Sequence, residues 1–435
     1  MVAGSETFSE FDRAPGGDHL TQMSRIEKRG RPPAVSLLKS WVLRRTHWPI
    51  LRSLFNLYEI RRLKPVISHP GLPAFPSRFL APPPIEPKHF QLAERLLKYW
   101  ERIALSGLRT GQLAKADLWT EIEARQGELA GICREQDPRR LVDFMLQAPR
   151  SPATQGFLQG DREYARLRHS RRYRNFIAHM TADKFISLAE AVGVLPVENP
   201  EQGDWGRSGL VDGAVLWAEI ETRLGVAATF PAAYGDLFVL DIGGRSVNER
   251  DLNAMYTAYR VKQALRGTTP GAVCEIGGGA GRTAYWMHQL AVAPLVIVDL
   301  PYVTLIQAWY LVLALGAERI RLWGEEPGDS QQITIYPSIA LNQVVEADFA
   351  LVLNQDSFPE MSEPAVVGYL EWMVDRRSQL LLSMNHESQP GYSAAARHLN
   401  VSRMLHDRGG MELLSRSPYW LRRGYTEELI KLPRV

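Results

Sequence analysis

The chain has 435 residues, a hydrophobic content of 45% and a formal net charge of +3, which favours a globular protein of two or three domains. No apolar run approaches the roughly 18 residues of a membrane-spanning helix, and the first residues lack the apolar core of a signal peptide. Because only Cys133 and Cys274 are present, we expect a cytoplasmic protein without a disulfide framework or a cysteine metal site.

The first 87 residues divide into three segments by composition. Residues 1–35 are polar and rich in Gly, Ser and Pro, which predicts a flexible tail. Residues 36–64 interleave aromatic and aliphatic side chains with Lys and Arg, the pattern of a basic amphipathic helix. Such a helix either packs on the next domain or lies on an anionic membrane surface, which would make the protein membrane-associated. Residues 65–87 are predicted to be a proline-rich linker.

Residues 88–235 are predicted to form a mainly helical accessory domain that contributes to the substrate site. Apolar residues at helical spacing after Lys88 begin this region, and further helices are predicted at Ala116–Cys133, Arg139–Leu146, Thr181–Val192 and Gly213–Arg223. Between them, Asp161–Arg174 carries six arginines. These side chains either form a partly ion-paired surface or clamp the diphosphate of a nucleotide-linked sugar.

Helices and strands alternate in residues 236–435, which predicts a mostly parallel, doubly wound Rossmann-like α/β sheet. Strands are predicted at Val273–Ile276, Leu295–Val298, Arg319–Trp323, Gln332–Tyr336, Asp348–Leu353 and Gln379–Met384, and helices at Asn248–Leu265, Thr283–Leu290, Leu305–Leu315 and Ala365–Val374. Leu237–Arg245 imitates a glycine turn, but an arginine replaces its last glycine. We therefore predict a strand or hairpin there instead of a second cofactor site.

The stretch Ala272–Val303 reads as a strand, a glycine turn, a helix and a second strand that ends in an acid. The turn has the pattern E-x-G-x-G-x-G and contains Glu275, Gly277, Gly278, Gly279 and Gly281. Glycines here let a ligand approach the bare backbone near a helix N-terminus. A dinucleotide fingerprint, G-x-G-x-x-G, would need glycine where the chain has Arg282.

An acid just before the first glycine suits a cofactor whose end is a cationic amino acid, which is S-adenosyl-L-methionine. Asp299, twenty residues after Gly279, is placed to accept hydrogen bonds from both ribose hydroxyls. We predict this cofactor and assign Leu300 and Asn354 to the cofactor side as well. A nicotinamide or flavin site, or a glycine turn that binds nothing, stays open as an alternative.

Two residues at the ends of later strands are candidates for proton removal. His386 is the first candidate base, because an ordinary histidine pKa near 6.5 suits neutral pH. The alternative is a histidine that only hydrogen-bonds a loop. Asp356 is the second candidate, either as a base or as the group that orients the acceptor.

Other polar residues near the same strand ends are assigned to the acceptor side or to the surface. Gln355 and Asn385 are predicted to contact the acceptor. Glu360, also assigned there, could join the preceding aspartate in holding Mg²⁺, although a glutamate after proline more often begins a helix and we predict no metal site. His398 and His406 lie on a predicted helix and are interpreted as surface residues.

With these residues in hand, the chain resembles the sugar O-methyltransferase family of deoxysugar and polysaccharide pathways, within the class I S-adenosylmethionine-dependent methyltransferases. Four motifs carry the resemblance, namely EIGGGAGR (Glu275–Arg282), VDLPY (Val298–Tyr302), LNQDSFPEM (Leu353–Met361) and NHES (Asn385–Ser388). It is clear from about 236 to 388, and the first 85 residues do not map onto it. The resemblance implies S-adenosyl-L-methionine as methyl donor and a sugar hydroxyl as acceptor.

The acceptor sugar could be a deoxysugar, a nucleotide sugar, a glycoside, a glycolipid or a polysaccharide unit. The enzyme alternative is a small-molecule O-methyltransferase that acts on a polyketide or phenolic hydroxyl, and the non-enzyme alternative is a partner protein that retains only the fold. No nucleic-acid partner is predicted, because no recognised binding module accompanies the basic segments. A homodimer is left open.

Overall fold

The computed structural model describes residues 49–433 apart from 70, 108–125, 204–205, 293, 347 and 389–397. The chain divides into two units, Met1–Glu59 and Ile60–Val435. The predicted tail 1–35, residues 36–48 of the basic segment and the first part of the predicted helix 116–133 lie outside the described residues. Helix α3 (Pro49–Leu63) confirms the helical prediction for the rest of the basic segment. None of the helices described is both long and apolar enough for a membrane crossing.

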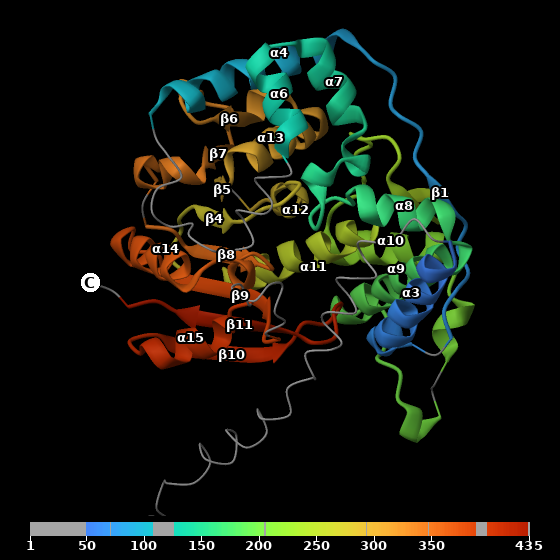
Figure 1. Cartoon of the computed structure of the whole chain (residues 1–435). Helices are drawn as coiled ribbons and strands as arrows, with labels where there is room; N and C mark the ends of the chain where they lie inside the picture. The colour runs from blue at the N-terminus through green and yellow to red at the C-terminus, as the bar shows by residue number, and fades with distance from the viewer. Residues whose placement is uncertain are drawn as a thin grey trace, which may run out of the picture. The chain divides into compact units, whose positions relative to one another are not determined.

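An eight-stranded sheet is the centre of the second unit. Its order is β10-β11-β9-β8-β4-β5-β7-β6, which Figure 1 shows from bottom to top. The strands are β4 (Val273–Ile276), β5 (Leu295–Asp299), β6 (Ile320–Leu322), β7 (Ile333–Pro337), β8 (Leu351–Gln355), β9 (Leu380–His386), β10 (Glu412–Pro418) and β11 (Tyr425–Lys431). From β6 to β9 all neighbours are parallel, whereas β11 is antiparallel to both β9 and β10. The predicted mostly parallel α/β fold is confirmed.

The direction of strand addition reverses at β4. Strands β5 and β7 continue on one side of it, and β8 and β9 on the other. Ligands of such sheets lie beyond the carboxyl ends of the strands at the reversal. The place of a sixth parallel strand in the dinucleotide-binding order is occupied here by antiparallel β11. This closing hairpin was not predicted from the sequence.

Helices cover the sheet and continue into the region that precedes it. They are α4 (Pro87–Leu105), α6 (Gly127–Glu135), α7 (Pro138–Leu146), α8 (Asp161–His169), α9 (Arg171–Ala191), α10 (Gly213–Leu224), α11 (Glu249–Ala264), α12 (Arg282–Gln289), α13 (Pro301–Leu315), α14 (Glu363–Asp375) and α15 (Val401–Arg408). Helix α11 packs against both α9 and α12, and α4 packs on α13 (Figure 1). Asn248 begins α11 with a capping box that it shares with Asp251, which satisfies the first backbone N–H groups.

The helical region and the sheet share one hydrophobic core. A single cluster of buried side chains extends from Leu92 on α4 to Leu421 beside the last hairpin. Within the predicted linker, β1 (Ser77–Phe79) pairs with β2 (Phe238–Ile242), which turns back into β3 (Arg245–Val247). The hairpin expected after residue 236 is therefore present. Among the described residues, this cluster includes side chains on both sides of 235/236, because apolar faces of the earlier helices are buried against the sheet domain.

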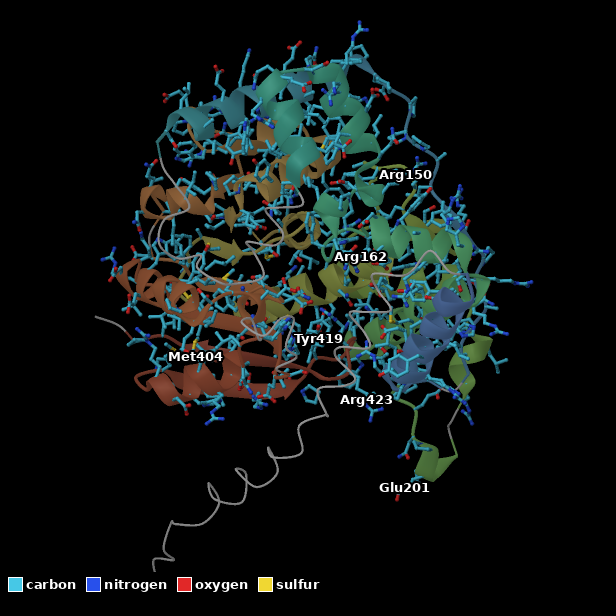
Figure 2. The ribbon with its side chains drawn as sticks, in the orientation of Figure 1. Arg150, Arg162, Glu201, Met404, Tyr419 and Arg423 are labelled. Atoms are coloured by element: carbon cyan, nitrogen blue, oxygen red, sulfur yellow. The ribbon has the colours of Figure 1, made fainter. Side chains whose placement is uncertain are left out.

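The arginine-rich segment 161–174 forms the end of α8 and the start of α9, separated by Ser170, whose side chain caps α9. The guanidinium of Arg166 lies 4.0 Å from the ring centre of Tyr173, and Arg174 donates hydrogen bonds to backbone carbonyls of α8. Arg162, labelled in Figure 2, is exposed. Because these side chains are partly engaged in local contacts, they favour the interpretation of the segment as a protein surface over that of a diphosphate clamp.

Buried His69 joins the chain before α4 to helix α9. Its Nδ1 lies 2.7 Å from Asp183 and its Nε2 lies 3.2 Å from Glu190. Burial by itself would lower the pKa of His69, but the hydrogen bonds and charges of the two acids outweigh it and raise the pKa to about 9.

We expect this histidine to make stability depend on pH. Because its pKa is raised, its contribution is complete below about pH 6.5 and is lost as pH rises through about 9. Urea unfolding between pH 6.5 and 9.5 should show a loss on the order of 1–3 kcal/mol that the His69→Gln variant lacks. A His179→Gln variant, at an exposed position, is the matched control and should lose as much stability as the wild type over this pH range. The same pH dependence in His69→Gln as in the wild type would contradict the prediction.

Candidate functional site

The glycine turn after β4 needs backbone conformations that other residues rarely adopt. Gly277, Gly279 and Gly281 have φ of +79°, +56° and +79°. The N–H of Gly277 donates to the carbonyl of Val298 at 2.9 Å, which fixes the turn to the neighbouring strand β5. The turn then opens into α12, for which Gly281 is the N-cap. The predicted strand, turn and helix are therefore all present.

Glu275 lies beneath the turn, as its sequence position predicted. A Cβ placed on Gly278 would come within 3.1 Å of Glu275 Oε2, so bare backbone covers the carboxyl group. Burial and the nearby charge of Asp299 raise the pKa of Glu275 to about 8, against a smaller lowering by a hydrogen bond from Thr283. Oε2 is buried without a hydrogen-bond partner among the residues that the structure describes. An unpaired buried oxygen at this place is an acceptor for a ligand donor.

Asp299 ends β5 and is only 5% exposed. Its Oδ1 accepts from the N–H of Leu300 at 2.7 Å, and its Oδ2 accepts from Gly279 at 3.1 Å and from Gln307 at 2.6 Å. A carboxylate has about four acceptor positions, so one is left on Oδ1. Burial raises the pKa of Asp299 to about 7, although these hydrogen bonds oppose the rise. The aspartate thus ties β5 to the glycine turn and keeps one acceptor for a ligand hydroxyl.

A cleft of about 760 Å³, including space open to solvent, lies over the turn. Its lining combines the turn with residues from α9, α11, the chain after β8 and the loop before β11: Gly156, Phe157, Lys184, Glu249, Arg250, Asn253, Ala254, Glu275, Gly277, Gly278, Gly279, Ala280, Arg282, Thr283, Gln355, Asp356 and Arg422. Phe157 stands in front of the turn, because a Cβ on Gly279 would lie 3.2 Å from its Cβ. The accessory region therefore supplies one wall of the cleft.

Several charged lining residues were missed by the sequence analysis. Lys184 on α9 is buried and pairs with Glu249 at the start of α11 at 3.0 Å, and Glu249 also pairs with Arg250 at 2.8 Å. Arg282 donates to buried Asp251 at 2.8 Å. The available signal was Lys184, which lies in the buried stretch 181–189 of α9. Because charged side chains are rarely buried unless paired, a lysine there indicates a buried ion pair or a site.

Asn354 and Asn385 hold the strand ends together. The amide of Asn354 donates to the carbonyl of Ile276 at 3.1 Å and to Ser357 Oγ at 2.6 Å. Asn385 donates to Asn354 Oδ1 at 3.0 Å and accepts from the N–H of Asp356 at 2.9 Å. Both side chains are buried, and neither lines the cleft. The two amides thus join the ends of β4, β8 and β9, and their predicted contacts with the cofactor and the acceptor stay a prediction.

Gln355 and Asp356 reach the cleft from the end of β8. Gln355 accepts a hydrogen bond from Thr257 at 3.0 Å. Asp356 has φ +67° and forms an ion pair with Arg422. Burial would raise the pKa of Asp356, but the charge and hydrogen bond of Arg422 and a hydrogen bond from Tyr425 hold it below its usual value. Asp356 is therefore an ionised acceptor facing the cleft.

His386 ends β9 but does not line the cleft. Its Nε2 lies 2.8 Å from Nδ1 of His398, and its ring meets Tyr425 edge-on at 5.4 Å. Burial lowers the pKa of His386; the charge of Asp356 partly offsets this effect, and the charge of Arg422 adds to it. The surface interpretation of His398 was wrong: it is 6% exposed, precedes α15, and its pKa is lowered to about 4 by burial and by His386. The chain turns it inward onto its partner histidine.

Glu360 closes the short 3₁₀ turn Phe358–Glu360 and does not line the cleft. Burial, and then the charge of Asp356, raise the pKa of Glu360 to about 8. The carboxylate of Asp356 is engaged by Arg422, so the two acids are not arranged as a pair of free ligands. Within the described part of the chain, no group of three His, Cys, Asp or Glu residues could hold a metal ion.

The Gly277→Ala variant is expected to destabilise the protein by about 1–3 kcal/mol more than Gly244→Ala. Both glycines have φ +79°, so both variants carry the same backbone strain. A Cβ at 277 would lie 2.2 Å from Oγ of Ser357, whereas nothing lies within 4 Å of a Cβ at 244. Chemical denaturation of the two variants measures the difference, and equal losses would show that Ser357 does not confine the turn.

Comparison with known proteins gives matches to solved structures alone. No protein-family model matches the chain, and no curated protein matches it. The glycopeptide N-methyltransferase MtfA complexed with S-adenosyl-L-methionine aligns at 14% identity and TM-score 0.32, over 41% of this chain and 94% of that chain. The magnesium protoporphyrin IX methyltransferase ChlM from Synechocystis PCC 6803 aligns at 17% identity and TM-score 0.30, over 42% and 83%. The ribosomal protein L11 methylase from Lactobacillus delbrueckii subsp. bulgaricus aligns at 10% identity and TM-score 0.29, over 43% and 81%.

Proposed function

We propose that the protein is an S-adenosyl-L-methionine-dependent O-methyltransferase. The observation that carries the proposal is the partnerless Oε2 of Glu275 beneath the turn. Its carboxyl group can meet the cationic amino-acid end of the cofactor, while Asp299 keeps an acceptor for a ribose hydroxyl. Two acids at the ends of neighbouring strands, at the point where strand order reverses, match the two ends of such a ligand.

The residues after β8 are suited to hold an acceptor hydroxyl. When bound, the cofactor supplies a sulfonium methyl group, whose C–S bond breaks as a C–O bond to the acceptor forms and the hydroxyl proton leaves. Asp356 is ionised and faces the cleft, so it accepts a hydrogen bond from the hydroxyl and orients it. Gln355 also lines the cleft, and its side-chain amide can hydrogen-bond a second polar group of the acceptor molecule. His386 stays our proposed base. Its ring contacts Tyr425 edge-on, and an intervening group would have to carry the proton from the cleft to it.

A sugar hydroxyl is the acceptor that we propose. The support is the set of four motifs that resemble those of sugar O-methyltransferases, two of which, Glu275–Arg282 and Leu353–Met361, contribute residues to the cleft, and the charged and polar side chains of the lining. The first test is thermal unfolding with S-adenosyl-L-methionine or S-adenosyl-L-homocysteine, where either ligand should raise the melting temperature. Absence of any rise at millimolar concentration would refute the proposal.

The acceptor class requires a separate experiment. Transfer of a labelled methyl group to nucleotide sugars, glycolipids, glycosides and phenols should label the sugars. Labelling of phenols alone would favour the small-molecule alternative. Cofactor binding without transfer to any member of the panel would favour a partner protein that has kept only the fold.

Cofactor binding is expected to release protons through Glu275. With a pKa of about 8 this group is mainly protonated at pH 7, and a nearby cation favours its ionised form. Calorimetry of S-adenosyl-L-homocysteine binding at pH 7 in buffers of different ionisation enthalpy should show proton release that Glu275→Gln reduces. Glu371→Gln, on an exposed side chain of α14, is the control and should release as many protons as the wild type. Equal release by all three proteins would contradict the role of Glu275.

A further inference from the structure

One wall of the cleft concentrates positive charge. Lys184 from α9, Arg250 from α11 and Arg422 from the loop before β11 all line it. Lys184 is only 6% exposed, and the charges of Arg422 and Arg250 both act to lower its pKa, after the larger effect of burial. Three cations from distant parts of the chain are therefore close enough to repel one another. Without a ligand, that arrangement costs free energy.

The carboxylates in this wall do not balance the cations. Glu249 pairs with both Lys184 and Arg250, and Asp356 pairs with Arg422. Among these five lining residues, two acids against three cations leave a net charge of +1. Arg250 also pairs at 3.3 Å with Glu163, which does not line the cleft.

Hydrogen-bond donors in the wall are also left over. An ammonium has three donors, and among the residues that the structure describes Lys184 Nζ donates only to Glu249, at 3.0 Å. The Nε of Arg250 is buried and has no partner in the part of the chain that the structure describes. Buried donors without partners are uncommon in folded proteins, and both side chains that carry these donors line the cleft.

We propose that Lys184, Arg250 and Arg422 bind an anionic group of the acceptor, a phosphoryl or a carboxylate group, beside the hydroxyl that is methylated. The inference rests on the proposed methyltransferase function. Arg422 connects the wall to the reaction, because its ion pair holds Asp356 at the end of β8. Charge-assisted hydrogen bonds from an ammonium and two guanidiniums fit the oxygens of such a group. The substrate class is thus an anionic sugar or sugar derivative.

The test uses the full chain saturated with S-adenosyl-L-homocysteine. Its melting temperature is measured with pyrophosphate, with malonate and with sodium chloride at the same ionic strength. We expect pyrophosphate or malonate, and not chloride, to raise the melting temperature by about 2 °C or more. A rise with pyrophosphate alone assigns a phosphoryl group, and a rise with malonate alone assigns a carboxylate.

The variants separate the wall from general effects of charge. Lys184→Met should lose the rise, and so should the double variant Lys184→Met with Glu249→Gln, which removes the buried pair together and guards against unfolding. Lys262→Met, on an exposed side chain of α11, the helix that carries Glu249 and Arg250, should retain it. No rise beyond that of chloride, or an equal rise in the Lys184 variants, overturns the inference.

Two further outcomes distinguish this inference from the proposed function. If pyrophosphate weakens the affinity for S-adenosyl-L-homocysteine about tenfold or more, the wall binds the cofactor's own carboxylate, and the inference fails while the proposed function stands. If S-adenosyl-L-homocysteine itself does not bind in calorimetry, the proposed function fails, and an acceptor site beside it fails with it.

Discussion

The Asp299→Ala variant should not be stabilised by S-adenosyl-L-homocysteine. The carboxylate holds the N–H of Gly279 at 3.1 Å and offers its remaining acceptor to the ribose, so alanine removes both the turn's anchor and a ligand contact. A hydrogen bond to a charged group is worth about 1.5–3 kcal/mol, so we expect an affinity loss of about 100-fold. Calorimetry and thermal unfolding with the ligand measure it.

The same variant should still fold. The pKa of Asp299 is raised from 3.8 to about 7 by burial, so the stability that its protonated form contributes is complete below about pH 3.8 and is lost as pH rises to about 7, which leaves little for alanine to remove above neutrality. Asp329→Ala, in an exposed loop, is the control and should bind the ligand as the wild type does. Gln307→Ala removes another partner of the carboxylate and should cause an intermediate loss. Wild-type affinity in a folded Asp299→Ala variant would remove Asp299 from the cofactor site.

The second large effect is expected for Asp356→Asn. If Asp356 orients the acceptor hydroxyl, its replacement should lower kcat by about 10²–10⁴-fold and leave the affinity for S-adenosyl-L-homocysteine within about threefold. The acceptor identified by methyl-label transfer is the substrate for this measurement. An unchanged kcat would exclude the aspartate from the reaction.

The pH dependence of kcat separates Asp356 from His386. The pKa of Asp356 is held low by Arg422, so a reaction that depends on this group alone should be flat above about pH 5. The pKa of His386 is lowered from 6.5 by burial, so dependence on this base should appear as a falling rate at pH below 6.5. Loss of that fall in His386→Gln would assign the base, and its persistence would make His386 a positioning residue.

Local patterns were enough to predict most of the sheet and the glycine turn. Buried strands such as β5 and β8 are continuous apolar runs, and β4 leads directly into glycines that no other residue replaces without strain. The hairpin of β10 and β11 was missed because the side chains of β10 are mostly exposed, so its sequence lacks the alternation that marks a strand.

Local sequence patterns could not predict the contacts that the site residues make. Asn354, Asn385 and His386 do lie at strand ends, yet Asn385 donates to Asn354 and His386 contacts His398. The end of a strand determines where the backbone of a residue lies, but the direction of its side chain depends on the residues that pack around it. Burial of the carboxyls under the turn, and so the raised pKa of Glu275, likewise depends on the whole fold.

The sequence by itself determined the parallel sheet, the glycine turn and the two acids at the ends of β4 and β5, because apolar runs, glycines and strand-end acids are local patterns that can be recognised without knowing which elements pair. The tertiary structure alone decided the opposite wall of the cleft. Lys184, Arg250 and Arg422 are separated by long stretches of chain, and only the packing of α9 on α11 and the return of the chain before β11 bring them together. Charges at such separations leave no periodic pattern in a sequence, so their convergence appears only in the folded molecule.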